Sequence, residues 1–269
     1  MTVLLLRRCL GKSNQQSQRK GRKHQADLLE NSFAQERGLS HTPRFRGTVR
    51  TIGRIQTEDD AIRFMRQVKF ALRYNSTPAL PLASMFGAIR DKRRAIELTN
   101  ALLARKEVIE TNIIADRLVL VHRDVLPALY ALRIRFRAAK LSNQAERAFR
   151  LIQTDGTASV GDVRRFLEVG GLKRPDPADL AVGELQRELL IDRGPSSVPK
   201  NGIPYLSREG FPYRVFERAH PELLKAAKKM KIEDALRMIL DATAAFPPRK
   251  TASMFKLCLS EAERRQIQP

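Results

Sequence analysis

The chain has 269 residues, of which 42% are hydrophobic, so it is long enough to bury a core of its own. Its net charge of +21 makes an anionic partner the first physical expectation, either a nucleic-acid backbone or an anionic membrane, and charge alone does not choose between them. Two cysteines near opposite ends and four scattered histidines give no indication of a disulfide framework or a metal site. No apolar run reaches the ~18–20 residues of a membrane span, so we expect a cytoplasmic, nucleoid-associated protein with no cofactor and no membrane partner.

Residues 1–57 carry the densest positive charge, with 12 basic and 3 acidic side chains. Their stretch KSNQQSQRKGRKHQ has no aliphatic or aromatic residue, so burial cannot offset the entropy of ordering it. We therefore predict a disordered basic arm. Three roles stay open for this arm: a contact to DNA, a mitochondrial presequence, because residues 1–23 are basic and lack acids, or an extension without function.

A first folded unit is predicted for residues 58–140, where apolar residues take helical spacing after the capping residue Thr57. The predicted elements are a helix starting at Glu58, helices at 82–89 and 93–103, strands at 108–114 and 117–121, and a connecting helix at 125–137. Three helices followed by a β-hairpin is the order of a winged helix.

A second unit of the same order is predicted for residues 141–215. Gly156 can take the left-handed conformation that ends a helix, Ser159 and Asp162 form a capping box, and Asp176 is placed to cap the third helix. The predicted strands lie at 190–193 and 205–207, on either side of the loop GPSSVPKNGIP, which has the composition of a wing.

The last segment, residues 216–269, is predicted to be helical, with helices at 221–230, 232–245 and 251–266. We expect it to form a helical cap on the second unit. The predicted fold class is therefore mainly α with short β-hairpins, an α+β chain of tandem winged-helix units with a C-terminal helical cap.

The third helix of the second unit is the element that would enter the major groove of DNA in a helix-turn-helix protein. Opposite its apolar stripe it displays Gly183, Glu184 and Arg187, with Asp179 near its start. Most of these side chains are acidic or absent, whereas base reading needs arginine, lysine or amides. We therefore expect non-specific binding through phosphate contacts, which position a protein without specifying a sequence.

The basic side chains that surround the helices of both units are the candidate DNA contacts. They are Arg90, Lys92, Arg93, Arg94, Arg164, Arg165, Lys173, Arg174, Arg187, Arg193 and Lys200. For the cluster at 90–94 a contact to an anion is the favoured interpretation, whereas a solvated helix face is an equal alternative for Arg164 and Arg165.

Signals for catalysis are thin, and the catalytic residues stay unknown. The spacing of His122 and Asp124 would place both on one face of a strand, and such a pair is more often found at the surface than in an active site. His220 precedes a proline at a helix start and is better explained as structural. No phosphate-cradling glycine loop and no metal-ligand spacing occurs in the sequence.

Residues 58–265 resemble the winged-helix group related to the AlkZ/YcaQ DNA glycosylases, through the phrases LPLASMFGAI, ADRLVLVHRDVLPALY, GELQRELLIDRG and GIPYLSREGFPYRVFERAHPELL. The resemblance implies tandem winged helices that form a cleft for duplex DNA, and a Gln-x-Gln pair that positions the hydrolytic water. In this chain Gln-x-Gln occurs only at 16–18 and 266–268, in the predicted tails.

Three hypotheses follow from the sequence. The leading one is a winged-helix DNA-binding protein related to repair glycosylases, whose partner is duplex DNA. The second is a DNA glycosylase that hydrolyses damaged bases with a different catalytic group. The third is a tandem winged-helix scaffold that binds a protein partner.

Overall fold

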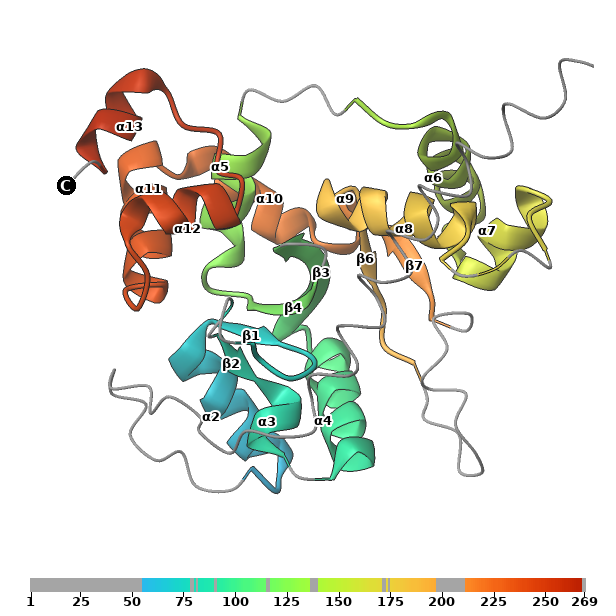
Figure 1. Ribbon diagram of the computed structural model, residues 1–269, viewed down its shortest axis with the longest axis horizontal. Coiled ribbons are helices and arrows are strands. Elements are labelled where there is room, and N and C mark those ends of the chain that lie inside the picture. The colour runs from blue at the N-terminus through green and yellow to red at the C-terminus, as the bar shows by residue number, and fades with distance from the viewer. Residues whose placement is uncertain are drawn as a thin grey trace, which may run out of the picture. The chain divides into compact units, whose positions relative to one another are not determined.

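The computed structural model describes residues 55–77, 80, 82–89, 91–114, 117–135, 140–170, 173, 175–196 and 211–267. The chain divides into two units, Met1–Val49 and Arg50–Pro269, and all the described residues belong to the second. The predicted arm, residues 1–57, therefore lies almost wholly outside the described part. That part is mainly helical with two small sheets, as expected for an α+β chain (Figure 1).

The first half of the described chain contains one sheet and four helices. Its elements are α2 (Glu58–Val68), β1 (Phe70–Leu72), β2 (Ala83–Ser84), α3 (Met85–Ala88), α4 (Lys92–Ala104), β3 (Val108–Ile114), β4 (Arg117–His122) and α5 (Leu126–Ile134). The sheet order is β2-β1-β4-β3, with β1 and β3 antiparallel to β4. The hairpin at 108–121 is thus confirmed, while strand β1 is an addition that was not predicted.

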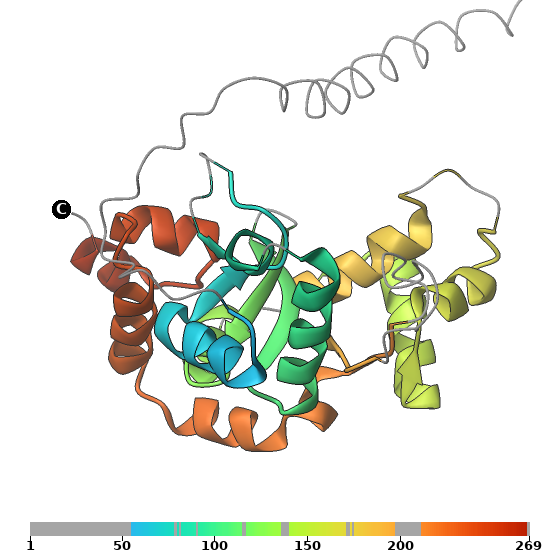
Figure 2. The ribbon, with the colours of Figure 1, turned by 90° about the horizontal axis from the view of Figure 1, so that it is seen from below.

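This sheet is buried on both faces, and alternate residues of its strands serve two different cores. In β1 and β4, Ala71 and Leu120 pack with helices α2, α3 and α4, while Phe70 and Val121 pack on the opposite side with α5. In Figure 2 helices α2 and α4 lie side by side, and residue contacts join them. Burial on both faces explains why all seven residues of β3, including Glu110, are buried.

The next segment, residues 143–215, has its own sheet and its own core. Its elements are α6 (Asn143–Asp155), β5 (Thr157–Ala158), α7 (Val160–Phe166), α8 (Pro177–Arg187), β6 (Ile191–Arg193) and β7 (Tyr213–Val215). β7 lies between β5 and β6 and is antiparallel to both. The predicted strand at 205–207 lies outside the described residues, and the partner of β6 is β7, eight residues further on.

The helix starts predicted from capping residues are confirmed. The side chains of Thr57, Ser159 and Asp176 each accept a hydrogen bond from the backbone N–H three residues on. The carboxylate at that position in turn accepts a hydrogen bond from the backbone N–H of the capping residue. Gly156 ends α6 at a φ of 76°, as the left-handed cap requires. These signals are local in the chain, which is why the sequence alone locates them.

The C-terminal segment is helical, but its helices are shorter than predicted. It contains α9 (Phe216–Ala219), α10 (Pro221–Lys229), α11 (Ile232–Ala242), α12 (Pro248–Met254) and α13 (Glu261–Gln266). The single helix predicted at 251–266 is therefore wrong, because the chain breaks at 255–260 between α12 and α13.

The position of this segment also differs from the expected cap on the second unit. Helices α10 and α11 contact α5 (Figure 1). Phe255 packs on Phe70 of β1 with ring centroids 4.7 Å apart. The buried guanidinium of Arg133 on α5 donates to the carbonyl oxygens of Phe255 and Arg187, which ties α5 to both neighbouring segments. The C-terminal helices thus complete the core beneath the first sheet. Among the described residues, no helix is long and apolar enough to cross a membrane.

Candidate nucleic-acid interface

The first turn of α4 is the exposed cationic element among the predicted contacts. Lys92, Arg93 and Arg94 follow the N-cap Asp91, whose carboxylate accepts bonds from the backbone N–H groups of Arg93 and Arg94 at 2.8 and 3.3 Å. All three basic side chains are exposed. Arg90, which precedes them, lies outside the described residues.

The two arginines of this turn have partners, but these partners are close to solvent. Arg94 donates to the backbone oxygen of Gln56 at 3.0 and 3.2 Å, and both Arg93 and Arg94 lie 3.2 Å from the Glu97 carboxylate. Exposed ion pairs of this kind contribute about 0–1 kcal/mol, so an incoming phosphate can replace them. A hollow of about 340 Å³ opens beside the turn and is lined by Gln56, Arg93, Arg94 and their neighbours.

The cations of this turn oppose the helix dipole. The N-terminus of a helix carries partial positive charge, so cations there are disfavoured by about 0.3–1 kcal/mol each. The first turn of α4 contains no acidic residue, as in α3, α5 and α12, whereas α2, α6, α7, α8, α9, α10, α11 and α13 each have one or more. The Asp91 carboxylate at the N-cap offsets part of the repulsion, and an anion bound by the basic side chains would offset more of it.

The corresponding helix of the second segment, α8, does not present a free face. Gly183 lies against Asn112 of β3, where an added Cβ would come within 3.6 Å of the Asn112 amide nitrogen. Gln186 is fully buried, and its carbonyl oxygen accepts a 2.8 Å bond from the Thr111 hydroxyl. The expectation that Gly183 is displayed to a ligand was wrong, because β3 covers that side of the helix.

The neighbours of Gly183 are similarly occupied. Glu184 accepts bonds from the backbone nitrogen and the hydroxyl of Ser142 at 2.8 and 2.7 Å, which fixes the start of α6. Arg187 is only half-buried, but its carbonyl oxygen accepts the bond from Arg133. Helix α8 therefore joins three segments instead of presenting a groove-reading surface.

Arg193 was predicted to contact phosphate, and the structure instead buries it completely. Its guanidinium lies 3.0 Å from the Glu110 carboxylate, donates to Asn100 at 2.6 Å and stands 3.5 Å from the centre of the Phe211 ring. A second buried arginine, Arg73, lies 2.8 Å from the same carboxylate. Burial lowers the pKa of Arg193, and the charge of Glu110 opposes that effect.

Glu110 and Arg193 occupy the same position in two similar turns. Lys106 ends α4 with a φ of 56°, and Leu189 ends α8 with the same value. Glu110 and Arg193 each follow four residues later, on β3 and β6, and they pair with each other. The two segments therefore pack through matching elements, and this buried pair joins them.

The remaining predicted contacts differ in accessibility. Arg164 is nearly buried and is bound to Asp176, the cap of α8, and to Asp179, which corrects its assignment to a solvated or phosphate-contacting face. Arg165 is exposed and pairs with Asp162, and Lys173 is exposed. Arg174 and Lys200 lie outside the described residues.

The histidines of the described chain sit in structural settings. His122 is 1% exposed, between Glu107 at 3.5 Å and Asp124 at 3.2 Å. Burial lowers the pKa of His122 against the opposing charge of Asp124, so the ring is neutral at pH 7. His220 is buried and lies 2.8 Å from the Asp192 carboxylate.

No group of three or more histidine, cysteine or acidic side chains in the described ranges could hold a metal ion. The buried carboxylates of the described residues are Glu110, Asp176, Asp192 and Glu263, and each of them is bound to an arginine. Gln16–Gln18 and Gln268 lie outside the described residues, and Gln266 is the last residue of α13.

The buried polar residues at this junction were not predicted as functional or structural sites. Glu110, Thr111 and Asn112 are three consecutive polar residues within the otherwise apolar strand sequence VIETNII. Polar residues in the middle of an apolar strand indicate polar contacts with another element, and this signal was available in the sequence. No family model, curated protein or solved structure matches this chain.

Proposed function

We propose that this protein binds duplex DNA non-specifically, through phosphate contacts made by two winged-helix-like units, with the first turn of α4 as the central contact. The order helix, strand, helix, helix, strand, strand of residues 143–215 recurs at 58–122, where the short strand β2 is added after β1, and this likeness supports the winged-helix assignment. In each segment the last strand lies between the two others that it pairs with. The resemblance to the AlkZ/YcaQ-related group favours the same arrangement.

The observation that carries the proposal is the set of exposed cations at the N-terminus of α4, Lys92, Arg93 and Arg94. In helix-turn-helix proteins the N-terminal residues of the third helix are those that reach the DNA. Helix α8, which corresponds to α4 in the second segment, is covered by β3 and does not enter the DNA groove in this proposal. Arg165 and Lys173 remain accessible as additional phosphate contacts.

This proposal contains no chemical step. Glu110 is held by Arg73 and Arg193 in the buried junction of the two segments, and Asp192 is buried beside Arg214 and His220, so a base in a duplex does not reach either carboxylate. A glycosylase mechanism with Glu110 would require the two segments to separate.

The test is a salt titration of binding to two duplexes of unrelated sequence. Phosphate contacts release counterions, so log K falls linearly with log salt with a slope of about −0.9 for each contact. We expect measurable binding at ~50 mM salt, a slope of about −3 or steeper, and affinities for the two duplexes that agree within roughly threefold. Absence of binding at low salt, or an affinity that salt does not change, would refute the proposal.

A further inference from the structure

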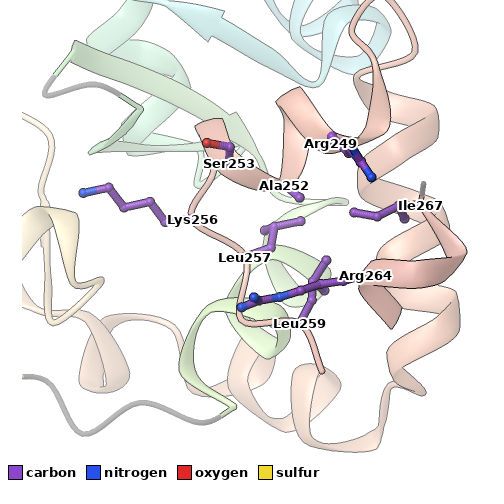
Figure 3. A pocket seen from close by; sticks show the side chains of 8 residues that line it. All are labelled: Arg249, Ala252, Ser253, Lys256, Leu257, Leu259, Arg264 and Ile267. Carbon is purple, nitrogen blue, oxygen red and sulfur yellow. The ribbon is translucent and has the colours of Figure 1, made fainter. Parts of the chain in front are cut away.

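A hollow of about 330 Å³ lies at the C-terminal end of the described chain, between α12 and α13 (Figure 3). The lining residues combine apolar and basic side chains, and none of them is acidic. They are Arg249, Ala252, Ser253, Lys256, Leu257, Leu259, Arg264 and Ile267. The volume falls within the range of about 300–1,000 Å³ that small-molecule sites occupy.

The apolar wall of the hollow is held in place by the surrounding fold. Leu257 and Leu259 belong to the link between the two helices, and Ile267 follows α13. The backbone nitrogen of Leu257 donates to the Ala252 oxygen at 2.9 Å, and that of Cys258 donates to Leu132 of α5 at 2.8 Å. The link therefore has a fixed path, and its leucines, which are 8% and 6% exposed, present only the edges of core side chains to the hollow.

The second helix of the hollow is also anchored. Ser260 caps α13 through a capping box with Glu263, and Glu263 in turn pairs with Arg135 beyond the end of α5. Both walls are thus attached to α5. A hollow between attached elements keeps its shape without a ligand, which lowers the cost of binding one.

The basic residues of the hollow lack acidic partners. Among the described residues, no carboxylate forms an ion pair with Arg249, Lys256 or Arg264, whereas Arg265 next to them pairs with Glu261. Figure 3 shows the Arg249 side chain ending near Ile267, the Arg264 side chain running in the other direction below Leu257 and Leu259, and Lys256 extending away. Each of the two exposed arginines can therefore hold an anionic group at its own edge of the hollow, and Lys256 adds only its charge.

We propose that this hollow binds a small organic anion, with its apolar body against the exposed edges of Leu257, Leu259 and Ile267 and its head group at one of the two guanidiniums, Arg249 or Arg264. A carboxylate or a phosphate monoester has the required chemistry, because the planar guanidinium donates two parallel bonds to either group. The apolar lining residues favour a ligand that carries a hydrocarbon part in addition to its anionic group. This site is separate from α4, and the proposal does not rest on DNA binding.

The experiment measures binding of four probes to the full chain by calorimetry: octanoate, octyl phosphate, inorganic phosphate and octanol. We expect saturable binding of at least one of the two amphiphilic anions, and at least tenfold weaker binding of inorganic phosphate and of octanol. The anion that binds more tightly identifies the head group.

Two double variants with the same loss of charge locate the site. Arg249→Ala/Arg264→Ala removes the two guanidiniums at the hollow, and Lys250→Ala/Arg265→Ala removes their immediate neighbours, which do not line it. We expect at least a tenfold loss of affinity in the first and less than a threefold change in the second. Thermal unfolding establishes that both variants are folded.

Three outcomes would overturn the proposal. The first is that neither octanoate nor octyl phosphate binds at millimolar concentration. The second is that inorganic phosphate binds as tightly as the amphiphilic anions, which would mean that the apolar wall takes no part. The third is an equal loss of affinity in the two double variants, which would show that net charge, and not the hollow, attracts the ligand.

Discussion

Glu110 shows how much one side chain contributes to joining the two repeated segments. Its carboxylate lies between the guanidiniums of Arg73 and Arg193, and all three side chains are at most 1% exposed. Desolvation makes such a group costly, and it persists because each charge has a partner. The Phe211 ring covers Arg193 and adds a cation–π contact.

Replacing Glu110 with glutamine would leave two buried guanidiniums without a negative partner. We expect Glu110→Gln to lower the free energy of unfolding by about 3–5 kcal/mol, the typical effect of removing one member of a buried ion pair. Urea unfolding followed by circular dichroism measures this change.

The matched control is Glu97→Gln, which removes the carboxylate that faces the exposed Arg93 and Arg94. An exposed pair contributes about 0–1 kcal/mol, so this variant should stay close to the parent chain. Equal effects in the two variants would show that the Glu110 cluster does not hold the segments together.

At the scale of elements, the C-terminal helices are part of the core of the first sheet. Phe255 is fully buried and contacts Phe70, and the Phe255 backbone oxygen accepts a 2.6 Å bond from Arg133. These contacts link residues more than one hundred positions apart in the chain. They explain why the segment is an integral part of the fold and not an added tail.

Truncation of Phe255 tests this packing. We expect Phe255→Ala to lower the free energy of unfolding by about 3–5 kcal/mol, as for a large aromatic side chain removed from a core. Phe166→Ala is the control, since Phe166 is 43% exposed and should change stability by less than about 1 kcal/mol. A small effect at Phe255 would contradict the shared core.

The elements that the sequence predicted are those with local signals. Thr57, Ser159, Asp176 and Gly156 fix helix ends through bonds or backbone angles within four residues, so no knowledge of the fold is needed to find them. Strand β1 is only three residues long, too short for alternation to be recognised, and it exists because β4 pairs with it.

The candidate site was predicted less completely than the helices. The exposure of Lys92, Arg93 and Arg94 agrees with the expected basic surface, but the burial of Arg193 does not. Whether an arginine faces solvent or a partner carboxylate depends on residues far away in the sequence, here Glu110 and Asn100. Periodicity shows which face is apolar, but not which second element covers the polar face.

At the scale of the whole molecule, a net charge of +21 gives the chain a field that attracts polyanions over about a Debye length, ~8–10 Å at physiological salt. Within the described part, many arginines are neutralised by acids in the junctions, as at Glu110 and Asp176. The first turn of α4 differs because its cations are exposed and oppose the helix dipole. The proposed DNA contact therefore lies at this turn.

The most direct test compares DNA binding by two double variants of equal charge. Lys92→Ala/Arg93→Ala removes two cations from the first turn of α4 and leaves the bond between Arg94 and Gln56 in place. Lys228→Ala/Lys229→Ala removes two exposed cations from the end of α10. We predict that the first variant makes the negative slope of log K against log salt less steep by about 2, because two phosphate contacts are lost. The same variant should keep or slightly raise the stability of the fold. The second variant should change the slope by less than about 0.5. Equal slopes in the two variants would contradict the assignment of the contact to α4.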